Sequence, residues 1–164
     1  VPRVRAATAP DTEVIAEIYN HYIRNTVVTF EETPISGEEI ARRIEVVEAA
    51  SLPWLVAEVG GQVRGYAYAG RWSPRSGYRH SAETAVYLDR AFPRRGLGTA
   101  LYTELFALLR DRGIHAIISG IALPNEPSVA LHEKFQMQKV AHFKAVGFKM
   151  GRWIDVGYWE RILD

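Results

Sequence analysis

The sequence predicts one α/β (α+β) domain, residues 1–164, in which helices flank a mixed β-sheet. Its length fits a single domain of ordinary size, and no repeat, low-complexity tract or long linker divides it. Apolar residues recur at helical spacing in some segments and alternate or run continuously in others. Hairpin signals occur near both ends, whereas helices alternate with strands in the second half. The expected order of elements is therefore β-α-α-β-β-β-α-β-α-β-β.

The N-terminal part is expected to form a strand and two helices. Arg3–Ala7 is a short strand, and the apolar residues of Asp11–Thr26 follow helical spacing. Ser36 and Glu39 have the spacing of a capping box, in which a serine hydroxyl accepts a hydrogen bond from the N–H three residues on. They open a second helix that ends at about Ala50.

A hairpin and a further strand follow these helices. Trp54–Val59 and Gln62–Trp72 have strand character, and Gly60-Gly61 between them is a hairpin turn. Residues 71–81 form a loop rich in arginine, serine and glycine. The next strand is expected over Glu83–Leu88.

The rest of the chain alternates between helices and strands before a final hairpin. A helix over Gly96–Arg112 ends at Gly113, a residue type that is common just past helix ends. Ile114–Ile121 is a continuously apolar strand, and Asn125–Phe135 is a helix that its first residue caps. The two closing antiparallel strands are Val140–Gly147 and Trp153–Ile162.

Composition limits the function classes. With 20 basic and 19 acidic residues the formal net charge is +1, which argues against a general nucleic-acid or membrane-surface binder. No apolar run approaches the roughly 20 residues that span a bilayer, and the N-terminal segment lacks the apolar core of a signal peptide. The absence of cysteine excludes disulfides, thiolate metal sites and a cysteine nucleophile. The five histidines are dispersed without metal-ligand spacing, so we expect a cytoplasmic enzyme without a metal.

A basic, glycine-rich turn at residues 88–101, LDRAFPRRGLGTAL, lies between a predicted strand and a predicted helix. A helix start offers backbone N–H groups without partners, and its dipole favours negative charge. Gly96 and Gly98 let phosphate oxygens approach the backbone, and Arg94 and Arg95 add positive charge. The segment lacks the lysine of a P-loop and the third glycine of a dinucleotide fingerprint. It therefore predicts a different kind of phosphate or pyrophosphate site, the alternative being an ordinary tight turn before a surface helix.

The run RRGLGTAL (residues 94–101) resembles the acyl-CoA loop of the GCN5-related N-acetyltransferases (GNAT), and the predicted order of elements is also theirs. Longer runs within residues 19–159 resemble the phosphinothricin N-acetyltransferase branch of that superfamily. The sequence departs from the pattern at Pro93, where relatives have glutamine or arginine, and at Phe135–Met137, where relatives end the helix with a Gly-Tyr or Gly-Phe pair. The similar runs are Pro53–Glu58, Ala67–Gly70, Glu83–Tyr87, Leu123–Glu133, Val146–Lys149 and Gly151–Trp159.

The resemblance implies the GNAT fold, with a mostly antiparallel central sheet flanked by helices, and acetyl-CoA as the acetyl donor. It implies transfer to the α-amino group of a small amino acid such as phosphinothricin, methionine sulfoximine or methionine sulfone, by a homodimer. The glycine loop would bind pyrophosphate through its backbone amides, and the preceding strand and the later helix start would contact the pantetheine arm. The cofactor-binding residues expected on this basis are Val86, Tyr87, Leu88, Arg94, Arg95, Gly96, Gly98, Thr99, Asn125 and Ser128.

Acetyl transfer requires an α-ammonium to lose a proton before its nitrogen attacks. The pKa of this group is about 7.7–8.0 in a peptide and higher in a free amino acid, so a base is useful near neutral pH. Glu83 matches the branch's catalytic glutamate, and the resemblance implies that it is this base, acting directly or through a water. The alternative is a strand-end carboxylate paired with Arg79 or His80. His132 is the second candidate, as a supporting base or substrate contact, or else as a helix histidine that only packs or forms hydrogen bonds.

An amino-acid substrate also carries a carboxylate, which suits the bidentate geometry of arginine. Arg71 and Arg75 are the expected ligands, with surface solvation as the alternative. The aromatic residues Phe30, Trp72 and Tyr78 would shape the pocket or belong to the core. Two other functions stay open: acetylation of another amine (a protein N-terminus, a polyamine or an aminoglycoside), and a non-catalytic acyl-CoA-binding module. A polyamine site should be acidic, whereas the arginines favour an acidic substrate.

Overall fold

The computed structural model describes residues 1–92 and 96–164. These residues form one seven-stranded sheet in the order β1-β2-β3-β4-β5-β7-β6. All neighbouring strands are antiparallel except β4 and β5, which are parallel, so the expected mixed and mostly antiparallel sheet is confirmed. The strands are β1 (Arg3–Ala6), β2 (Trp54–Val59), β3 (Gln62–Arg71), β4 (Ser81–Leu88), β5 (Ala116–Leu123), β6 (Gln138–Lys149) and β7 (Arg152–Ile162).

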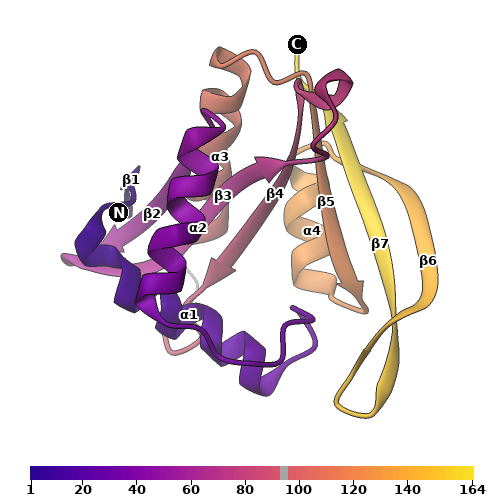
Figure 1. Ribbon diagram of the computed structural model, residues 1–164, viewed down its shortest axis with the longest axis horizontal. Helices are drawn as coiled ribbons and strands as arrows, with labels where there is room; N and C mark the ends of the chain where they lie inside the picture. The colour runs from indigo at the N-terminus through magenta and orange to yellow at the C-terminus, as the bar shows by residue number, and fades with distance from the viewer. Residues whose placement is uncertain (93–95) are drawn as a thin grey trace.

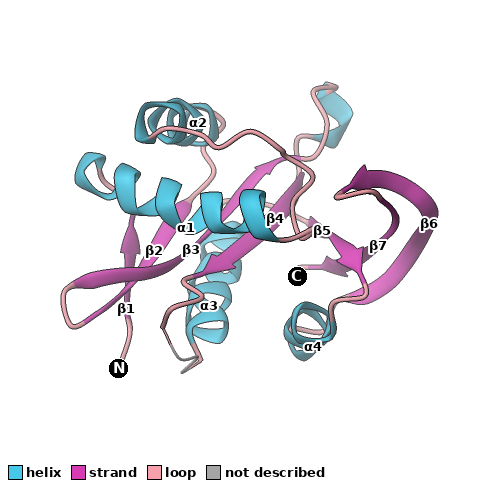
Figure 2. Cartoon of the chain, turned by 90° about the horizontal axis from the view of Figure 1, so that it is seen from below, coloured by secondary structure: helices cyan, strands magenta, loops and turns pink. Residues whose placement is uncertain are grey.

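In the described part of the chain, α-helices cover both faces of this sheet. Figure 2 shows α1 and α2 on one face and α3 and α4 on the other. Helices α1, α2 and α3 each bury an apolar side: in α1, the buried residues Ile15, Ile18 and Tyr22 follow the spacing of one helix face. The helices are α1 (Thr12–Asn25), α2 (Gly37–Ala49), α3 (Leu97–Asp111) and α4 (Glu126–Lys134), with short 3-10 turns η1 (Ala9–Asp11) and η2 (Ser76–Tyr78).

The order of helices and strands matches the sequence prediction, and their ends differ from it by one or two residues. β5 begins at Ala116, two residues later than expected, and β6 covers Gln138–Lys149 instead of Val140–Gly147. The cap of α2 is confirmed, since Ser36 Oγ accepts a hydrogen bond from the N–H of Glu39 at 3.1 Å. β6 is longer than predicted because it follows β7 through two register shifts, a long-range arrangement that local composition does not reveal.

The core lies on both sides of the sheet. Between the sheet and α1, aromatic rings stack: the ring centroids of Trp54 and Tyr68 are 4.1 Å apart, and Tyr87 meets Tyr19 edge to face at 5.0 Å. On the other side, α3 inserts fully buried leucines at every fourth position, so that this helix is held by apolar burial. These leucines are Leu101, Leu105 and Leu109.

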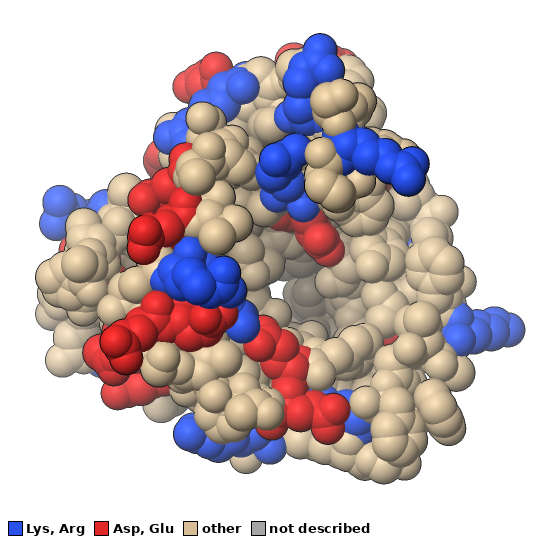
Figure 3. Space-filling model, in the orientation of Figure 1, with Lys and Arg blue, Asp and Glu red and all other residues tan. Residues whose placement is uncertain are grey.

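β4 and β5 separate part of the way along their length. Their parallel pairing joins only Ser81–Glu83 to Ala116–Ile118, after which the two strands continue without pairing to each other. Figure 1 shows them diverging, with α4 on the far side of the gap. The same face in Figure 3 is hollowed at its centre, over this gap. A crevice at the carboxyl ends of two parallel strands is a common position for a ligand site.

Candidate active site

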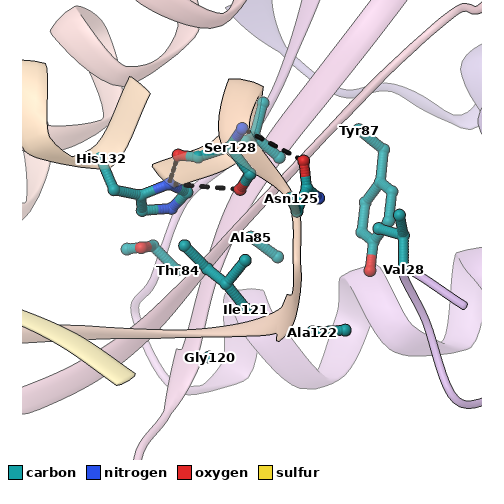
Figure 4. Close-up of a pocket in the computed structure, with 11 residues that line it drawn as sticks. Val28, Thr84, Ala85, Tyr87, Gly120, Ile121, Ala122, Asn125, Ser128 and His132 are labelled. Atoms are coloured by element: carbon teal, nitrogen blue, oxygen red, sulfur yellow. Dashed lines mark hydrogen bonds between the residues drawn. The ribbon is translucent and has the colours of Figure 1, made fainter. Parts of the chain in front are cut away.

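The gap between β4 and β5 contains a pocket of about 60 Å³. Four segments line it: β4, β5, the start of α4 and the loop between α1 and α2 (Figure 4). The lining residues are Val28, Thr84, Ala85, Val86, Tyr87, Gly120, Ile121, Ala122, Asn125, Ser128 and His132. The predicted strand and the predicted helix start of the donor site therefore lie on two sides of one pocket.

The edge of β4 that faces the pocket has unpaired backbone groups. The carbonyl of Thr84 points to this edge, because it accepts a hydrogen bond from Ser119 Oγ of β5 at 2.9 Å. Backbone groups of a strand alternate between its two edges, so those of Val86 point the same way. In the described chain no strand pairs with Val86 on that side. An extended ligand that carries amide groups, such as a pantetheine arm, fits such an edge by adding the hydrogen bonds of a neighbouring strand.

Tyr87 and Leu88, also predicted at this strand, are partly engaged in the fold. The ring of Tyr87 packs against Tyr66 at a centroid distance of 5.6 Å, so its side chain belongs mainly to the core although it reaches the pocket wall. The carbonyl of Leu88 accepts a hydrogen bond from the hydroxyl of Tyr22 on α1. Val86 is thus the residue of this strand whose backbone is most open to a ligand.

The glycine loop leads from β4 into α3. Gly96 has a φ of +76°, a left-handed conformation, and a Cβ at this position would meet nothing within 4 Å. An open, left-handed glycine immediately before a helix leaves the first N–H groups of α3 accessible to an anion. Arg94 and Arg95, the predicted cationic partners, lie outside the described residues.

Gly98 has a packing role that the sequence did not indicate. It lies inside the first turn of α3, is buried, and does not share the positive φ of Gly96. A Cβ on Gly98 would lie 3.0 Å from Leu131 Cδ2. The missing side chain therefore lets α3 and α4 pack closely, and the only contribution that Gly98 can offer an anion is its backbone N–H.

Lys134 is a cation near the start of α3 that sequence reasoning missed. Its Nζ donates a hydrogen bond to Thr99 Oγ1 at 3.0 Å. Thr99 is a predicted cofactor contact in the first turn of α3, so this ammonium adds positive charge where an anion would bind. No sequence pattern links the two residues, because only the packing of α4 against α3 brings them together.

Glu83 is a half-buried carboxylate without an ion pair in the described part of the chain. Arg79, its suggested partner, instead donates from Nη1 to the carbonyl of Ser76 at 3.0 Å, and the structure shows no bond from His80 to Glu83. Burial raises the pKa of Glu83 above its ordinary value, because the ionised form has lost water without gaining a compensating charge. The carboxylate is therefore a stronger proton acceptor than one in water.

Aromatic side chains surround Glu83. It stands opposite Gly70 of β3, two residues before Trp72. Burial raises the pKa of Tyr68 to about 12 and raises that of Tyr158 as well, and the charge of Glu83 adds to both effects. Both phenols are therefore neutral near pH 7. Trp72 meets Tyr158 edge to face, with ring centroids 6.0 Å apart. Its role as a pocket wall stays a prediction.

Glu83 and His132, the two predicted catalytic residues, lie on opposite faces of the sheet. Tyr87 packs on α1, and side chains alternate along a strand, so Glu83 faces the α1 side as well. Thr84 faces the other way, and the hydroxyl of Tyr102 on α3 lies 3.4 Å from its Oγ1. His132 contacts the same tyrosine. The gap therefore connects a face that carries a carboxylate with a face that carries an imidazole.

His132 is buried and both of its ring nitrogens have partners. Nδ1 lies 2.7 Å from the carbonyl oxygen of Ser128, and Nε2 lies 2.9 Å from the hydroxyl of Tyr102. Figure 4 shows the ring turned toward Ser128 at the pocket wall. Burial lowers the pKa of His132, although the bond to Ser128 opposes this effect. His132 can take a proton at Nε2 only if the hydroxyl of Tyr102 turns from donor to acceptor.

The two predicted carboxylate ligands occupy different positions. Arg71 stands opposite Ala82 of β4, which directs it to the α3 side, away from Glu83, and it donates to the carbonyl of Pro74 at 3.1 Å. Arg75 is exposed in the loop before η2; its carbonyl accepts from the N–H of Tyr78, and its guanidinium has no hydrogen bond to another described residue. Figure 3 shows basic side chains above the hollow and, next to acidic ones, at its left. The structure therefore leaves Arg75 more available than Arg71 to a ligand on the Glu83 side.

The remaining predicted wall residues, Phe30 and Tyr78, lie apart. Tyr78 is exposed in η2. Phe30 packs on β6, where a Cβ on Gly147 would come within 2.3 Å of its ring. Beside it, Lys149 Nζ donates to the carbonyl of Thr29 at 2.8 Å. The loop between α1 and α2 is thereby fastened to β6, and it bounds the α1 side of the gap.

The described residues contain no group of three or more histidine, aspartate or glutamate side chains that could hold a metal ion. Among the same residues, no helix is both long and apolar enough to cross a membrane.

Known proteins resemble this chain over almost its whole length. Residues 4–157 match the model of the acetyltransferase (GNAT) domain. The chain is 40% identical over 158 residues to the phosphinothricin N-acetyltransferase of Streptomyces viridochromogenes, covering 96% of this chain and 86% of that protein. It is 32% identical over 161 residues to the L-methionine sulfoximine/L-methionine sulfone acetyltransferase of Salmonella typhimurium, covering 98% and 94% of the two chains.

A solved structure shows the same fold with a bound donor. The GNAT-superfamily phosphinothricin acetyltransferase of Sinorhizobium meliloti, determined in complex with acetyl-CoA, superposes with a TM-score of 0.95 at 36% sequence identity. The match covers 99% of this chain and 88% of that one.

Proposed function

The chain belongs to the GNAT acetyltransferase family, and we propose that it transfers the acetyl group of acetyl-CoA to the α-amino group of a small amino acid with Glu83 as general base. The main observation behind this proposal is the environment of the Glu83 carboxylate. It is a half-buried carboxylate with a raised pKa and no ion pair in the described chain, at the point where β4 and β5 separate. A structural carboxylate in this position would be expected to have a partner.

The donor site combines three features described above. The open edge of β4 at Val86 suits the amides of the pantetheine arm, and the start of α3 after Gly96 suits the pyrophosphate. Asn125 and Ser128 line the opposite side of the pocket, and Lys134 adds positive charge beside Thr99. In this arrangement acetyl-CoA supplies an activated acetyl group, and the protein holds that group in place for the reaction.

The acceptor approaches from the α1 side, where Glu83 lies. Glu83 takes a proton from the α-ammonium, directly or through a water, and leaves a neutral amine. The amine nitrogen then attacks the acetyl carbonyl, the carbon–sulfur bond breaks, and coenzyme A leaves as a thiolate. The nitrogen loses its second proton to the thiolate or to solvent, which leaves the amide. A backbone N–H on the open edge of β4 would polarise the carbonyl during this attack.

His132 is the second candidate for the base. Its two hydrogen bonds make it a weaker one than Glu83, because protonation at Nε2 would require the hydroxyl of Tyr102 to turn from donor to acceptor. Its lowered pKa acts in the same direction, since a buried imidazole resists the charged form. A supporting role for His132 remains part of the proposal.

The proposed acceptor is a free amino acid whose carboxylate meets Arg75. Relatives of this chain carry names that specify phosphinothricin and methionine sulfoximine or sulfone, which share a tetrahedral phosphorus or sulfur centre on an amino-acid backbone. The aromatic surroundings of Glu83, including Trp72, would enclose the side chain of such a substrate. An exposed arginine at the rim disfavours a polyamine.

A thiol-release screen tests this function. Acetyl-CoA is incubated with the protein and with phosphinothricin, methionine sulfoximine, methionine sulfone, ordinary amino acids and a polyamine, and free thiol is measured. We expect release with one or more of the free amino acids and little with their carboxamides or with the polyamine. Stabilisation of the protein by coenzyme A without thiol release across the panel would instead indicate a binding module.

A homodimer is part of the same proposal. The β6–β7 hairpin carries apolar side chains that are more than half exposed, an unusual density for a surface that stays in water. A second copy would cover them, and Trp153→Glu should then yield monomers in sedimentation velocity at micromolar protein. A wild-type monomer under these conditions would contradict it. The exposed residues are Val140, Phe143, Val146, Phe148, Met150 and Trp153.

A further inference from the structure

Two buried hydroxyl groups bridge β4 and β5 at the point where the strands separate. The last paired residues are Glu83 and Ile118, and the next ones are Thr84 and Ser119. Thr84 Oγ1 and Ser119 Oγ lie 2.5 Å apart, and Ser119 Oγ donates to the carbonyl of Thr84 at 2.9 Å. Side-chain bonds therefore replace the next rung of the backbone ladder. Thr84 is 3% exposed and Ser119 1%, so water does not compete for these groups.

The polar contacts continue from this bridge to both helices on that face. Tyr102 of α3 is fully buried, and its hydroxyl lies 3.4 Å from Thr84 Oγ1 and 2.9 Å from His132 Nε2. His132 Nδ1 in turn reaches the carbonyl of Ser128 in α4. One chain of contacts thus joins β5, β4, α3 and α4, the last of which lines the pocket opposite β4.

The hydrogens of this chain can be assigned from its acceptors. The carbonyl of Ser128 only accepts, so His132 carries its hydrogen on Nδ1 and Nε2 accepts from Tyr102. Ser119 uses its hydrogen for the carbonyl of Thr84, so the Thr84 hydroxyl donates to Ser119 Oγ. Burial lowers the pKa of His132 and raises that of Tyr102 to about 12, so both are neutral near pH 7. Each of these hydrogens then has one acceptor, and the hydroxyls of Tyr102 and Thr84 meet at 3.4 Å as a polar contact that receives none of them.

We propose that Thr84, Ser119 and Tyr102 are positioning residues that set the width of the gap between β4 and the start of α4. The bridge holds the strands together where they begin to separate, and Tyr102 fixes α4 through His132. The inference rests on the proposed function, since the groove of defined width is the one proposed for the pantetheine arm. It gives His132 a part in holding the groove, in addition to any part in proton transfer.

Removing single hydroxyls tests this role without removing bulk. Tyr102→Phe keeps the ring that packs on Phe106 at 4.8 Å, and Thr84→Val keeps the branched shape of a strand residue. Thr12→Val is the matched control, because its hydroxyl bonds a backbone carbonyl at the start of α1, away from the gap. We expect each test variant to raise the Kd for coenzyme A, measured by titration calorimetry, by about 5- to 10-fold. The control should leave that Kd unchanged.

Further measurements separate positioning from plain stability. Tyr102→Phe and Thr84→Val should raise KM for acetyl-CoA while kcat and the KM of the amine change little, at temperatures well below Tm. Their combined effect on Kd should be smaller than the product of the single effects, because both act on one chain. By ¹⁵N NMR, wild-type His132 should have its hydrogen on Nδ1, and Tyr102→Phe should shift the Nε2 resonance but hardly that of Nδ1.

Three results would overturn the inference. One is a lowered Tm in both variants with unchanged affinity for coenzyme A, which would make the chain a source of stability only. Another is a wild-type His132 with its hydrogen on Nε2, since the assigned bond directions would then be wrong. The third is a wild-type protein that does not bind coenzyme A, and this result alone would also overturn the proposed function.

Discussion

The ionisable side chains on the two sides of β4 differ in whether other protein groups bind them. On the α1 side, Glu83 is half-buried and has no ion pair in the described chain, so burial raises its pKa. On the α3 side, His132 is almost fully buried, and both ring nitrogens have hydrogen-bond partners. Both groups have lost contact with water. Only the histidine has hydrogen-bond partners in the protein that replace the lost water. An uncompensated group is available for a substrate, whereas a compensated one holds its surroundings in place.

This difference also predicts opposite effects of pH on stability. A carboxylate whose pKa is raised by folding binds more protons in the folded state, so its contribution to stability is lost as pH rises through the raised pKa. A histidine whose pKa is lowered contributes fully above its ordinary pKa of about 6.5 and loses that contribution as pH falls through the lowered value. The α1 side is therefore destabilised by ionised Glu83 at neutral pH, and the α3 side by protonation of His132 in acid.

The largest expected effect comes from Glu83→Gln. The amide keeps the shape of the carboxylate but cannot accept the ammonium proton, so kcat/KM should fall about 10²-fold or more near pH 7. The deficit should shrink as pH rises, because more of the amine is then neutral in solution. Melting curves at neutral pH should show an unchanged or higher Tm, since the variant removes an uncompensated charge.

A structural carboxylate would behave differently in the same experiment. If Glu83 formed an ion pair, Glu83→Gln would lower Tm and reduce the rate by a smaller factor that does not depend on pH. Near-normal turnover at pH 7 would remove Glu83 from the mechanism and leave His132 as the next base to test.

On the α3 side, Gly98→Val should disturb the packing that positions α4. The Cβ alone would lie 3.0 Å from Leu131 Cδ2, and two methyl groups add to this, so we expect a loss of about 1–3 kcal/mol in the free energy of unfolding. Coenzyme A affinity should fall about 10-fold or more, because the proposed donor site uses the starts of both α3 and α4. Chemical denaturation and titration calorimetry measure the two effects.

The smaller Gly98→Ala variant should show both effects in weaker form, and Leu131→Ala should partly restore Gly98→Val by making space. Unchanged affinity for coenzyme A in a folded Gly98→Val protein would show that this contact does not shape the donor site.

On the α1 side, Arg75→Ala should raise KM for the free amino acid about 10-fold, through loss of a charge-assisted contact with its carboxylate. Acetyl-CoA affinity should not change, and a substrate amidated at the carboxylate should be affected far less. Arg71→Ala is the matched comparison, because Arg71 faces away from Glu83. Equal effects of the two variants would contradict the assignment, and no effect of either would make both arginines solvated surface groups.

The smallest effect is expected at the end of α4. Gln136 follows the helix with a φ of +66°, a conformation that favours glycine. Gln136→Gly should therefore raise the free energy of unfolding by up to about 1 kcal/mol, the relief of left-handed strain being partly offset by the entropy of glycine. Denaturant titration measures it, with coenzyme A affinity unchanged. A clear destabilisation would mean that the side chain of Gln136 makes a contact that outweighs the strain.

Much of the fold was predictable because its signals are local. Apolar spacing located the helices and strands to within two residues, and the Ser36 cap and the Gly113 helix end follow from single side chains. The pairing of β6 with β7 was less predictable in detail, because register shifts depend on how two distant segments meet. The signal for the proposed phosphate site at Gly96 is also local, since such a site needs only an open backbone before a helix.

The candidate site was predictable in its residue types and less so in its geometry. Sequence resemblance selected Glu83, Val86, Asn125 and His132, and the structure places them around the same gap. The resemblance did not indicate that the missing side chain of Gly98 lets α3 and α4 pack closely. The partners Thr84, Ser119 and Tyr102 carry no local signal, because each is an ordinary strand or helix residue whose role appears only when buried neighbours meet.

The sequence by itself determined the order of elements, the family and the chemical groups available, because these depend on spacing along the chain and on residue identity. Only the tertiary structure decided that Glu83 and His132 face opposite sides of the sheet and that one is uncompensated while the other is bonded. Burial and hydrogen bonding depend on every segment that packs around a residue, and those segments are far apart in the chain. The protonation behaviour of the site is therefore a property of the fold.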